Sequence, residues 1–334
     1  MKIAELQPIP EWRGVDGETF RREIATQYRP AVLKGLVRTW PAVRRALESP
    51  ESICEYLMAF DNGKAVDAIM TPPEENGRIF YRPDLRGFNY LRNKLSITAV
   101  IRQLARYSQF PDHPALAIQS APVAECLPGF SAENGLTILG AEIPPRIWIG
   151  NAITTPAHFD ESNNIACVAS GRRRFILFPP EQAANLYIGP LDHAPTRTPI
   201  SMVSFKDPDF TRFPKFREAL AAAQCAELEP GDAIYIPSLW WHHVESIGEL
   251  NILVNYWWKA ANGAQAAESP FDCLLRCARS LQGLPAEQRL AWGALFNHAL
   301  FAPDVDPGAH LSVQRRGVLG GAETSEGDGR SDER

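Results

Sequence analysis

The chain has 334 residues, with 34 Lys or Arg against 39 Asp or Glu, so its formal net charge is −5. This mildly acidic balance gives no general attraction for nucleic acid or for an anionic membrane, and we expect neither as a partner. A composition of 45% hydrophobic and 22% charged residues is that of a globular protein. The 28 prolines disfavour a coiled coil or helical array, because proline interrupts helices.

Nothing in the sequence predicts export or membrane insertion. No apolar run reaches the roughly 18 residues that a membrane helix requires. The first residues carry Glu5 and Pro8 where a secretory signal would place its apolar core. The six cysteines are scattered and include no Cys-x-x-Cys pair. We therefore predict a cytoplasmic protein with reduced thiols.

Residues 1–110 mix short helical and extended patterns, and we expect them to form N-terminal elements packed on the main domain. Residues 29–35 (RPAVLKG) predict a short strand that ends in a turn. Residues 96–107 have apolar side chains at helical spacing and predict a helix.

Residues 111–260 consist of short apolar runs separated by Pro, Gly and Asn. Such runs, rich in β-branched and aromatic residues, are typical of strands in a sandwich or barrel, so the predicted fold class is mainly β. Ser170 and Gly171 lie between two of the runs and predict a tight hairpin. The predicted strands cover residues 146–150, 164–169, 174–178, 233–236 and 251–257.

Residues 261–315 return to a helical pattern. Ser269, Pro270 and Asp272 have the spacing of an N-cap, a first-turn proline and an acidic third position. A second helix is predicted from residue 285 to about residue 301. Residues 316–334 have almost no apolar content, and we expect this tail to be disordered.

Two of the seven histidines lie in a His-x-acid pattern, which is about the number that chance provides. In the first, His158 and Asp160 would share one face of a strand and could present an imidazole and a carboxylate to one metal ion. Two histidines and one carboxylate hold Fe(II) on one side and leave the opposite positions open. The spacing alone leaves open the alternative of a hydrogen-bonded structural histidine.

A third ligand is expected from residues 240–246 (WWHHVES), just after an apolar run. Adjacent strand residues face opposite sides, so His242 pairs with Val244 and His243 pairs with Glu245. The apolar partner makes His242 the better candidate for a barrel interior. His243 and Glu245 are then expected to face outward and to be solvated.

Several ordered blocks resemble the JmjC/cupin-like oxygenases, and among them the factor-inhibiting-HIF asparaginyl hydroxylase group. The resemblance is strongest between about residues 146 and 259 and continues more weakly toward the N-terminus. The blocks that carry it are residues 155–164 (TPAHFDESNN), 170–180 (SGRRRFILFPP), 230–246 (PGDAIYIPSLWWHHVES) and 255–257 (NYW).

The resemblance implies a double-stranded β-helix, which is a jelly-roll barrel, with helices packed outside. His158, Asp160 and His242 match the family's Fe(II) ligands. The family binds 2-oxoglutarate to the iron and uses O₂ to convert it to succinate while hydroxylating a C–H bond. Thr155 matches a threonine that contacts the far carboxylate of 2-oxoglutarate.

The same resemblance shows two departures around that carboxylate. Arg173 stands where the family has a lysine, and its guanidinium could keep the electrostatic role with a different geometry. Ala117 stands at the position of a family tyrosine, with Gln119 matching a neighbouring polar residue. Asn164 and Asn255 match amides that line the iron pocket.

Two further features follow from the resemblance, each with a plainer alternative. Trp257 matches an aromatic wall of the pocket, and the alternative is core packing. The helices after the barrel form a homodimer in the family, and the alternative is an intramolecular core. The apolar face concerned comprises Phe271, Leu274, Leu275, Ala278 and Leu281.

The predicted function is an Fe(II)- and 2-oxoglutarate-dependent oxygenase that hydroxylates a protein side chain or a small molecule. The first alternative is a metal-binding, cupin-like binding or regulatory module without 2-oxoglutarate turnover, which Arg173 and Ala117 motivate. The second is a cupin-type isomerase or hydrolase that uses Zn(II) or Mn(II).

Overall fold

The computed structural model describes residues 6–259, 269–302 and 306–316. The chain divides into two compact units at residues 266 and 267. The first unit contains the strands and the second is helical. The finer division at residues 110 and 260 stays a prediction, and the predicted tail, apart from Arg316, lies outside the described residues.

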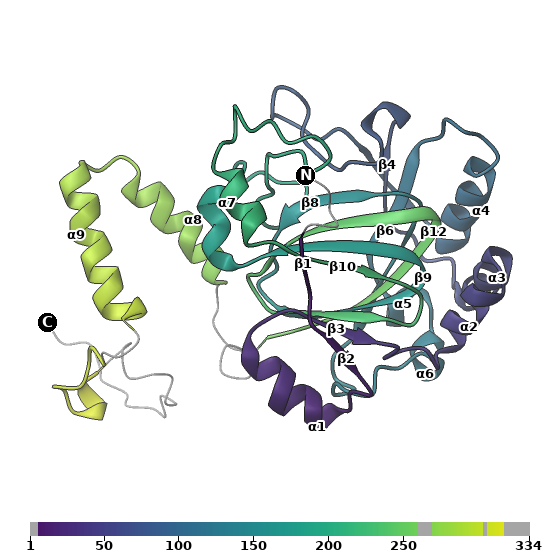
Figure 1. Ribbon diagram of the computed structural model, residues 1–334, viewed down its shortest axis with the longest axis horizontal. Helices are drawn as coiled ribbons and strands as arrows, with labels where there is room; N and C mark the ends of the chain where they lie inside the picture. The colour runs from purple at the N-terminus through teal and green to yellow at the C-terminus, as the bar shows by residue number, and fades with distance from the viewer. Residues whose placement is uncertain (1–5, 260–268, 303–305, 317–334) are drawn as a thin grey trace, which may run out of the picture. The chain divides into compact units, whose positions relative to one another are not determined.

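Twelve strands of the described chain join in one hydrogen-bonded sheet that curves into a barrel (Figure 1). The predicted mainly β class, a jelly-roll barrel with flanking helices, is confirmed. The strands are β1 (Gln7–Pro8), β2 (Glu11–Arg13), β3 (Ala31–Lys34), β4 (Val66–Thr71), β5 (Leu91–Leu95), β6 (Ala115–Pro122), β7 (Pro145–Gly150), β8 (Thr154–His158), β9 (Asn163–Phe178), β10 (Gln224–Leu228), β11 (Ala233–Ile236) and β12 (Trp241–Trp258).

Two long antiparallel strands, β9 and β12, belong to both walls of the barrel. The second half of β9 pairs with β10, and the first half of β12 pairs with β8. Their other halves pair with β11 and β7, and this wall continues outward through β6, β4 and β5. The two walls therefore share strands β9 and β12, and residues far apart in the chain face one barrel interior.

Gly171 marks the point where β9 bends from one wall to the other. Its φ is +73°, and a Cβ there would lie 2.6 Å from the carbonyl oxygen of Leu250. Ser170 pairs with Ile252 and Arg172 with Ile247, so residues 248–251 bulge out of β12 opposite the glycine. The predicted hairpin at this point is wrong, because the two apolar runs form one continuous strand.

The bend also changes which residues face the interior. Before it, Ala166 and Val168 of β9 join the interior cluster, and after it Phe175 and Leu177 do so. The inward positions thus change from even to odd numbers, and β12 changes likewise between Val244 and Leu253. Polar residues on opposite sides of the bend consequently face the same cavity.

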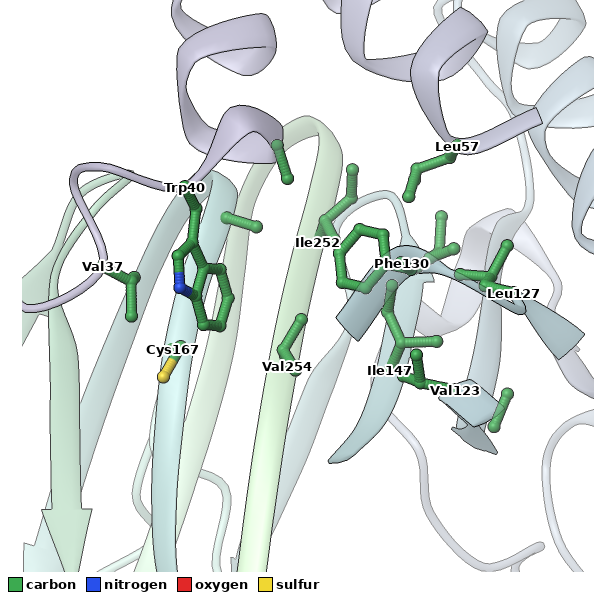
Figure 2. Close-up of a cluster of buried hydrophobic side chains, with 14 of the residues drawn as sticks. Val37, Trp40, Leu57, Val123, Leu127, Phe130, Ile147, Cys167, Ile252 and Val254 are labelled. Carbon is green, nitrogen blue, oxygen red and sulfur yellow. The ribbon is translucent and has the colours of Figure 1, made fainter. Parts of the chain in front are cut away.

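Helices cover the outer face of the wall that contains β7, β9 and β12. Their apolar side chains pack on outward-facing Cys167, Ile147, Ile252 and Val254, and Trp40 and Phe130 lie in this cluster (Figure 2). The helices of the first unit are α1 (Gly17–Thr19), α2 (Pro41–Glu48), α3 (Pro50–Phe60), α4 (Ile97–Tyr107), α5 (Val123–Cys126), α6 (Phe130–Glu133) and α7 (Phe216–Ala221).

The second unit contains α8 (Pro270–Leu281) and α9 (Ala286–Phe296), followed by a π-helical turn at Asn297–Phe301. Ser269 caps α8, because its Oγ accepts a hydrogen bond of 3.1 Å from the Asp272 amide, as predicted. Within the described ranges, no helix combines the length and apolar character needed to cross a membrane.

Candidate metal centre

Three potential ligands meet at one end of the barrel. His158 ends β8 and pairs directly with His242 of β12, and Asp160 follows two residues after His158. One ligand atom from each of the three lies within 4.8 Å of the others. The Nε2 atom of His242 is 3.7 Å from Asp160 Oδ2. The structure thus brings together the three residues expected from the sequence, and they can hold a metal ion.

Backbone carbonyls orient both imidazoles. His158 Nδ1 lies 2.9 Å from the Pro156 oxygen, and His242 Nδ1 lies 3.0 Å from the Trp240 oxygen. A carbonyl only accepts hydrogen bonds, so each Nδ1 carries the hydrogen and each Nε2 keeps its lone pair for a metal. Burial, with a smaller effect of His242, lowers the pKa of His158 and favours the neutral imidazole.

Trp257 holds the carboxylate of the same group. Its indole Nε1 donates a hydrogen bond of 2.9 Å to Asp160 Oδ2. The Leu239 amide donates to the Asp160 carbonyl at 2.8 Å, which holds the backbone as well. Trp257 was expected only as an aromatic wall of the pocket, and its contact with Asp160 was not predicted.

The amides predicted to line the pocket meet each other. Asn255 Nδ2 donates to Asn164 Oδ1 at 3.0 Å, and both side chains are buried. Asn255 Oδ1 and the indole Nε1 of Trp148 are buried without a hydrogen-bond partner in the described structure. Trp148 was not singled out from the sequence, although it alternates with outward-facing Ile147 and Ile149 on β7.

The residues predicted to bind the far carboxylate of 2-oxoglutarate line a small interior cavity. Arg173 lines it together with Thr155, Gln119 and Ala117. Arg173 is only 8% exposed, its Nε lacks a hydrogen-bond partner, and it makes no ion pair with a described residue. Burial lowers its pKa to about 10, which leaves the guanidinium charged at neutral pH.

An unpaired buried cation is costly unless an anion reaches it. The Arg173 cavity therefore fits the carboxylate of a bound acid. Ser246 also lines this cavity and pairs in register with Arg173. Ser246 was not predicted as a site residue, although it lies two residues after inward-facing Val244 on the same strand and so shares its face.

The expectation for His243 and Glu245 was partly wrong. They face the outside of the barrel, but His243 is only 3% exposed because the Phe205 ring stacks on it, with centroids 4.2 Å apart. Glu245 lies 3.2 Å from His243 Nε2 and accepts a hydrogen bond of 2.6 Å from Arg174. The loop that carries Phe205 lies far away in sequence, so strand alternation could not predict this cover.

A jelly-roll barrel with two histidines and one carboxylate at its mouth is typical of a class of metal-binding proteins. In this class the three side chains occupy three adjacent coordination positions of one metal ion. The chain belongs to the cupin-like domain family, whose model matches residues 17–264. This confirms the predicted family, whereas the closer likeness to the factor-inhibiting-HIF group stays a prediction.

Curated relatives share parts of the chain. Human HSPB1-associated protein 1 is 35% identical over 173 residues, which cover 49% of this chain and 32% of that protein. The lysine-specific demethylase JMJ31 of Arabidopsis thaliana is 33% identical over 34% of this chain and 21% of its own length. The tRNA wybutosine-synthesizing protein 5 of Danio rerio is 26% identical over 78% of this chain and 77% of its own length.

Proposed function

We propose that the protein is an Fe(II)- and 2-oxoglutarate-dependent oxygenase that hydroxylates a C–H bond. The observation that carries the proposal is the convergence of His158, Asp160 and His242 beside the buried, unpaired guanidinium of Arg173. When bound, iron and 2-oxoglutarate supply the activation of O₂, with succinate and CO₂ as products.

The protein's own residues position these groups. His158 and His242 offer Nε2 lone pairs whose direction is set by the carbonyls of Pro156 and Trp240. Trp257 orients the carboxylate of Asp160. Each ligand is therefore held before metal binding, which reduces the ordering that binding would otherwise require.

The cosubstrate is proposed to lie along the interior between the metal ligands and Arg173. Arg173 and the Thr155 hydroxyl would hold its far carboxylate, with Gln119 nearby. Asn164, Asn255 and Trp257 are proposed to line the space nearer the metal. The two free hydrogen-bonding atoms, Asn255 Oδ1 and Trp148 Nε1, are available to bound groups.

The substrate is proposed to be a protein side chain or a small molecule. One relative is named as a lysine-specific demethylase, which supports a protein substrate. Another is named for tRNA wybutosine synthesis, but the net charge of −5 gives this chain no general attraction for RNA. We place the protein in the cytoplasm, and the six free cysteines agree with a reducing compartment.

A homodimer through the C-terminal helices completes the proposal. The second unit exposes several large apolar side chains, which a partner could cover. They are Leu274, Leu290, Trp292, Leu295, Leu300 and Phe301. Sedimentation at micromolar concentration should give twice the 37.1 kDa chain mass, and L290E should give the monomer. A monomer for the unaltered chain would contradict the dimer.

A second candidate is a metal-binding module that captures another acid without turnover. It is favoured by Ala117, whose methyl side chain lines the Arg173 cavity. Ala117 also pairs with Gly150 so closely that a Cβ on the glycine would lie 2.6 Å from the Ala117 Cβ. This wall of the Arg173 cavity thus has no hydroxyl to offer a carboxylate. Metal and acid binding without succinate would support this candidate.

The test starts from anaerobic protein to which Fe(II) and then 2-oxoglutarate are added. We expect a visible charge-transfer band, followed by succinate release on exposure to air. H158A should lose the band at all 2-oxoglutarate concentrations. R173Q should keep metal affinity but need much more 2-oxoglutarate, whereas R174Q, the matched arginine on the outer face, should behave as the unaltered chain. Absence of both band and succinate in the unaltered chain would reject the proposal.

A further inference from the structure

A second cavity lies on the outer face of the strands that carry the metal ligands. Its volume is about 740 Å³, within the range of roughly 300–1,000 Å³ that small-molecule sites occupy. His243 and Thr154 contribute to its floor, and their chain neighbours His242 and Thr155 face the interior. The sheet therefore lies between this outer cavity and the metal centre, and Ser246 lines both the outer cavity and the Arg173 cavity.

The charges on the floor of the outer cavity satisfy one another. Arg174 donates to Glu245 at 2.6 Å and to Glu227 at 3.1 Å. Glu245 also lies 3.2 Å from His243 Nε2. The floor consequently presents a closed network of ion pairs, and its carboxylates are not free to neutralise further cations.

Two cations that line the outer cavity have no ion-pair partner in the described residues. Arg78 stacks over the Phe80 ring, with its Cζ 3.6 Å from the ring centroid, and its Nη2 is buried without a hydrogen-bond partner. Lys206 also lines the cavity and is exposed. Glu75 also lines the cavity and attracts Arg78 without an ion pair, and its carboxylate accepts a hydrogen bond of 2.6 Å from Asn89.

Further groups in the cavity suit the remainder of a ligand. Phe205 provides an apolar surface beside the charged residues. His243 is 3% exposed, and its Nδ1 is buried without a partner. A compact anion would give Arg78 the charge-assisted hydrogen bonds that its partly buried guanidinium lacks.

We propose that this outer cavity binds a small organic acid or phosphate compound, with its anionic head group between Arg78 and Lys206. The shared chemistry is a compact anion with several acceptor oxygens, attached to a part that packs on Phe205. The site requires neither the metal nor 2-oxoglutarate, so it stands or falls apart from the proposed oxygenase activity.

The experiment titrates the full chain with inorganic phosphate and, in a separate arm, with tartrate, and measures heat of binding. At least one probe should bind at millimolar or lower concentration, and the arm that binds identifies phosphate or carboxylate as the preferred head group. R78Q should weaken that binding at least about tenfold, because it removes a charge-assisted contact. K206Q should weaken it about threefold, since Lys206 is exposed.

Two control variants separate this site from other cations. K94Q removes a positive charge from the exposed strand β5 and should leave binding unchanged. R173Q tests whether the probe has entered the interior cavity and should leave in place the binding that R78Q removes. Because Lys206 is exposed, K206E tests the site even if R78Q fails to fold. The proposal is overturned if neither probe binds, if R173Q abolishes binding, or if the Lys206 variants match K94Q.

Discussion

The indole N–H of Trp257 donates a hydrogen bond of 2.9 Å to Oδ2 of Asp160. The two residues are 97 positions apart in sequence; Trp257 lies near the end of β12 beside the start of β9, and Asp160 shortly precedes β9. A donor to one carboxylate oxygen leaves the other free to face a metal and limits rotation of the side chain. Such contacts to metal ligands typically affect metal affinity by 10- to 100-fold.

W257F should therefore weaken metal binding about tenfold while keeping an aromatic ring in place. The measurement is an anaerobic titration with Co(II), followed by the visible spectrum of the bound ion. W148F is the matched control, because Trp148 packs edge-to-face on Trp257 at 6.5 Å but its Nε1 has no described partner. Equal losses in both variants would assign the effect to packing.

The neighbouring arginines 173 and 174 predict opposite effects on stability. R173M removes an unpaired buried charge and should raise the free energy of unfolding of the metal-free, acid-free protein by about 1 kcal/mol or more. R174M breaks the pairs with Glu245 and Glu227 and should lower it by about 1 kcal/mol. Urea unfolding measures both. Destabilisation by R173M would show that Arg173 has an internal partner.

Because β9 bends at Gly171, we expect any side chain at this position to lower the free energy of unfolding strongly. G171A must accommodate a Cβ 2.6 Å from a backbone oxygen at positive φ, and we expect a loss above about 3 kcal/mol together with weaker metal binding. G63A is the control, since Gly63 has φ +79° and open space around its Cβ position, and should cost only about 1 kcal/mol. Similar losses in urea unfolding would argue against a steric origin.

Stability should fall as the pH drops below the ordinary histidine range. Burial lowers the pKa of both His158 and His243, so below about pH 6.5 the unfolded chain binds protons that the folded chain does not. The contribution of the two histidines to the free energy of unfolding is thus fully present above this pH. It is lost as the pH falls toward their lowered pKa values in the folded chain. Each histidine contributes up to about 1.4 kcal/mol per pH unit.

Urea unfolding of metal-free protein between pH 8 and pH 5 measures this slope. H243Q should make the slope shallower, because it removes the contribution of the lowered His243 pKa and leaves that of His158. A slope that is the same in H243Q and the unaltered chain would contradict the assignment to these two residues.

Most of the strands were predictable because their apolar runs are short and bounded by turn residues. The run 233–236 coincides with β11, and the cap at Ser269 begins α8 as its spacing indicated. The join at Gly171 was not predictable in this way. Ser170-Gly171 has the composition of a hairpin, and only the cross-strand bulge at residues 248–251 shows that the chain continues through a bend.

The grouping of His158, Asp160 and His242 could be predicted from short segments together with the family resemblance, although Asp160 lies two residues beyond the end of β8 and not on a strand face as expected. The contacts around them depend on residues brought together by the change of inward parity on β9 and β12. Trp257 on Asp160 and Phe205 on His243 both join segments separated by long stretches of chain. Local periodicity carries no information about such pairs.

In the proposed oxygenase, 2-oxoglutarate decarboxylation depends on the group formed by His158, Asp160 and His242. The most direct measurement is succinate formed from 2-oxoglutarate in air, by the Fe(II)-loaded full chain and by H158A, followed by NMR. We expect steady succinate formation by the unaltered chain, even without substrate, and none above the iron-only background with H158A. Equal rates for the two proteins, or no succinate from either, would contradict it.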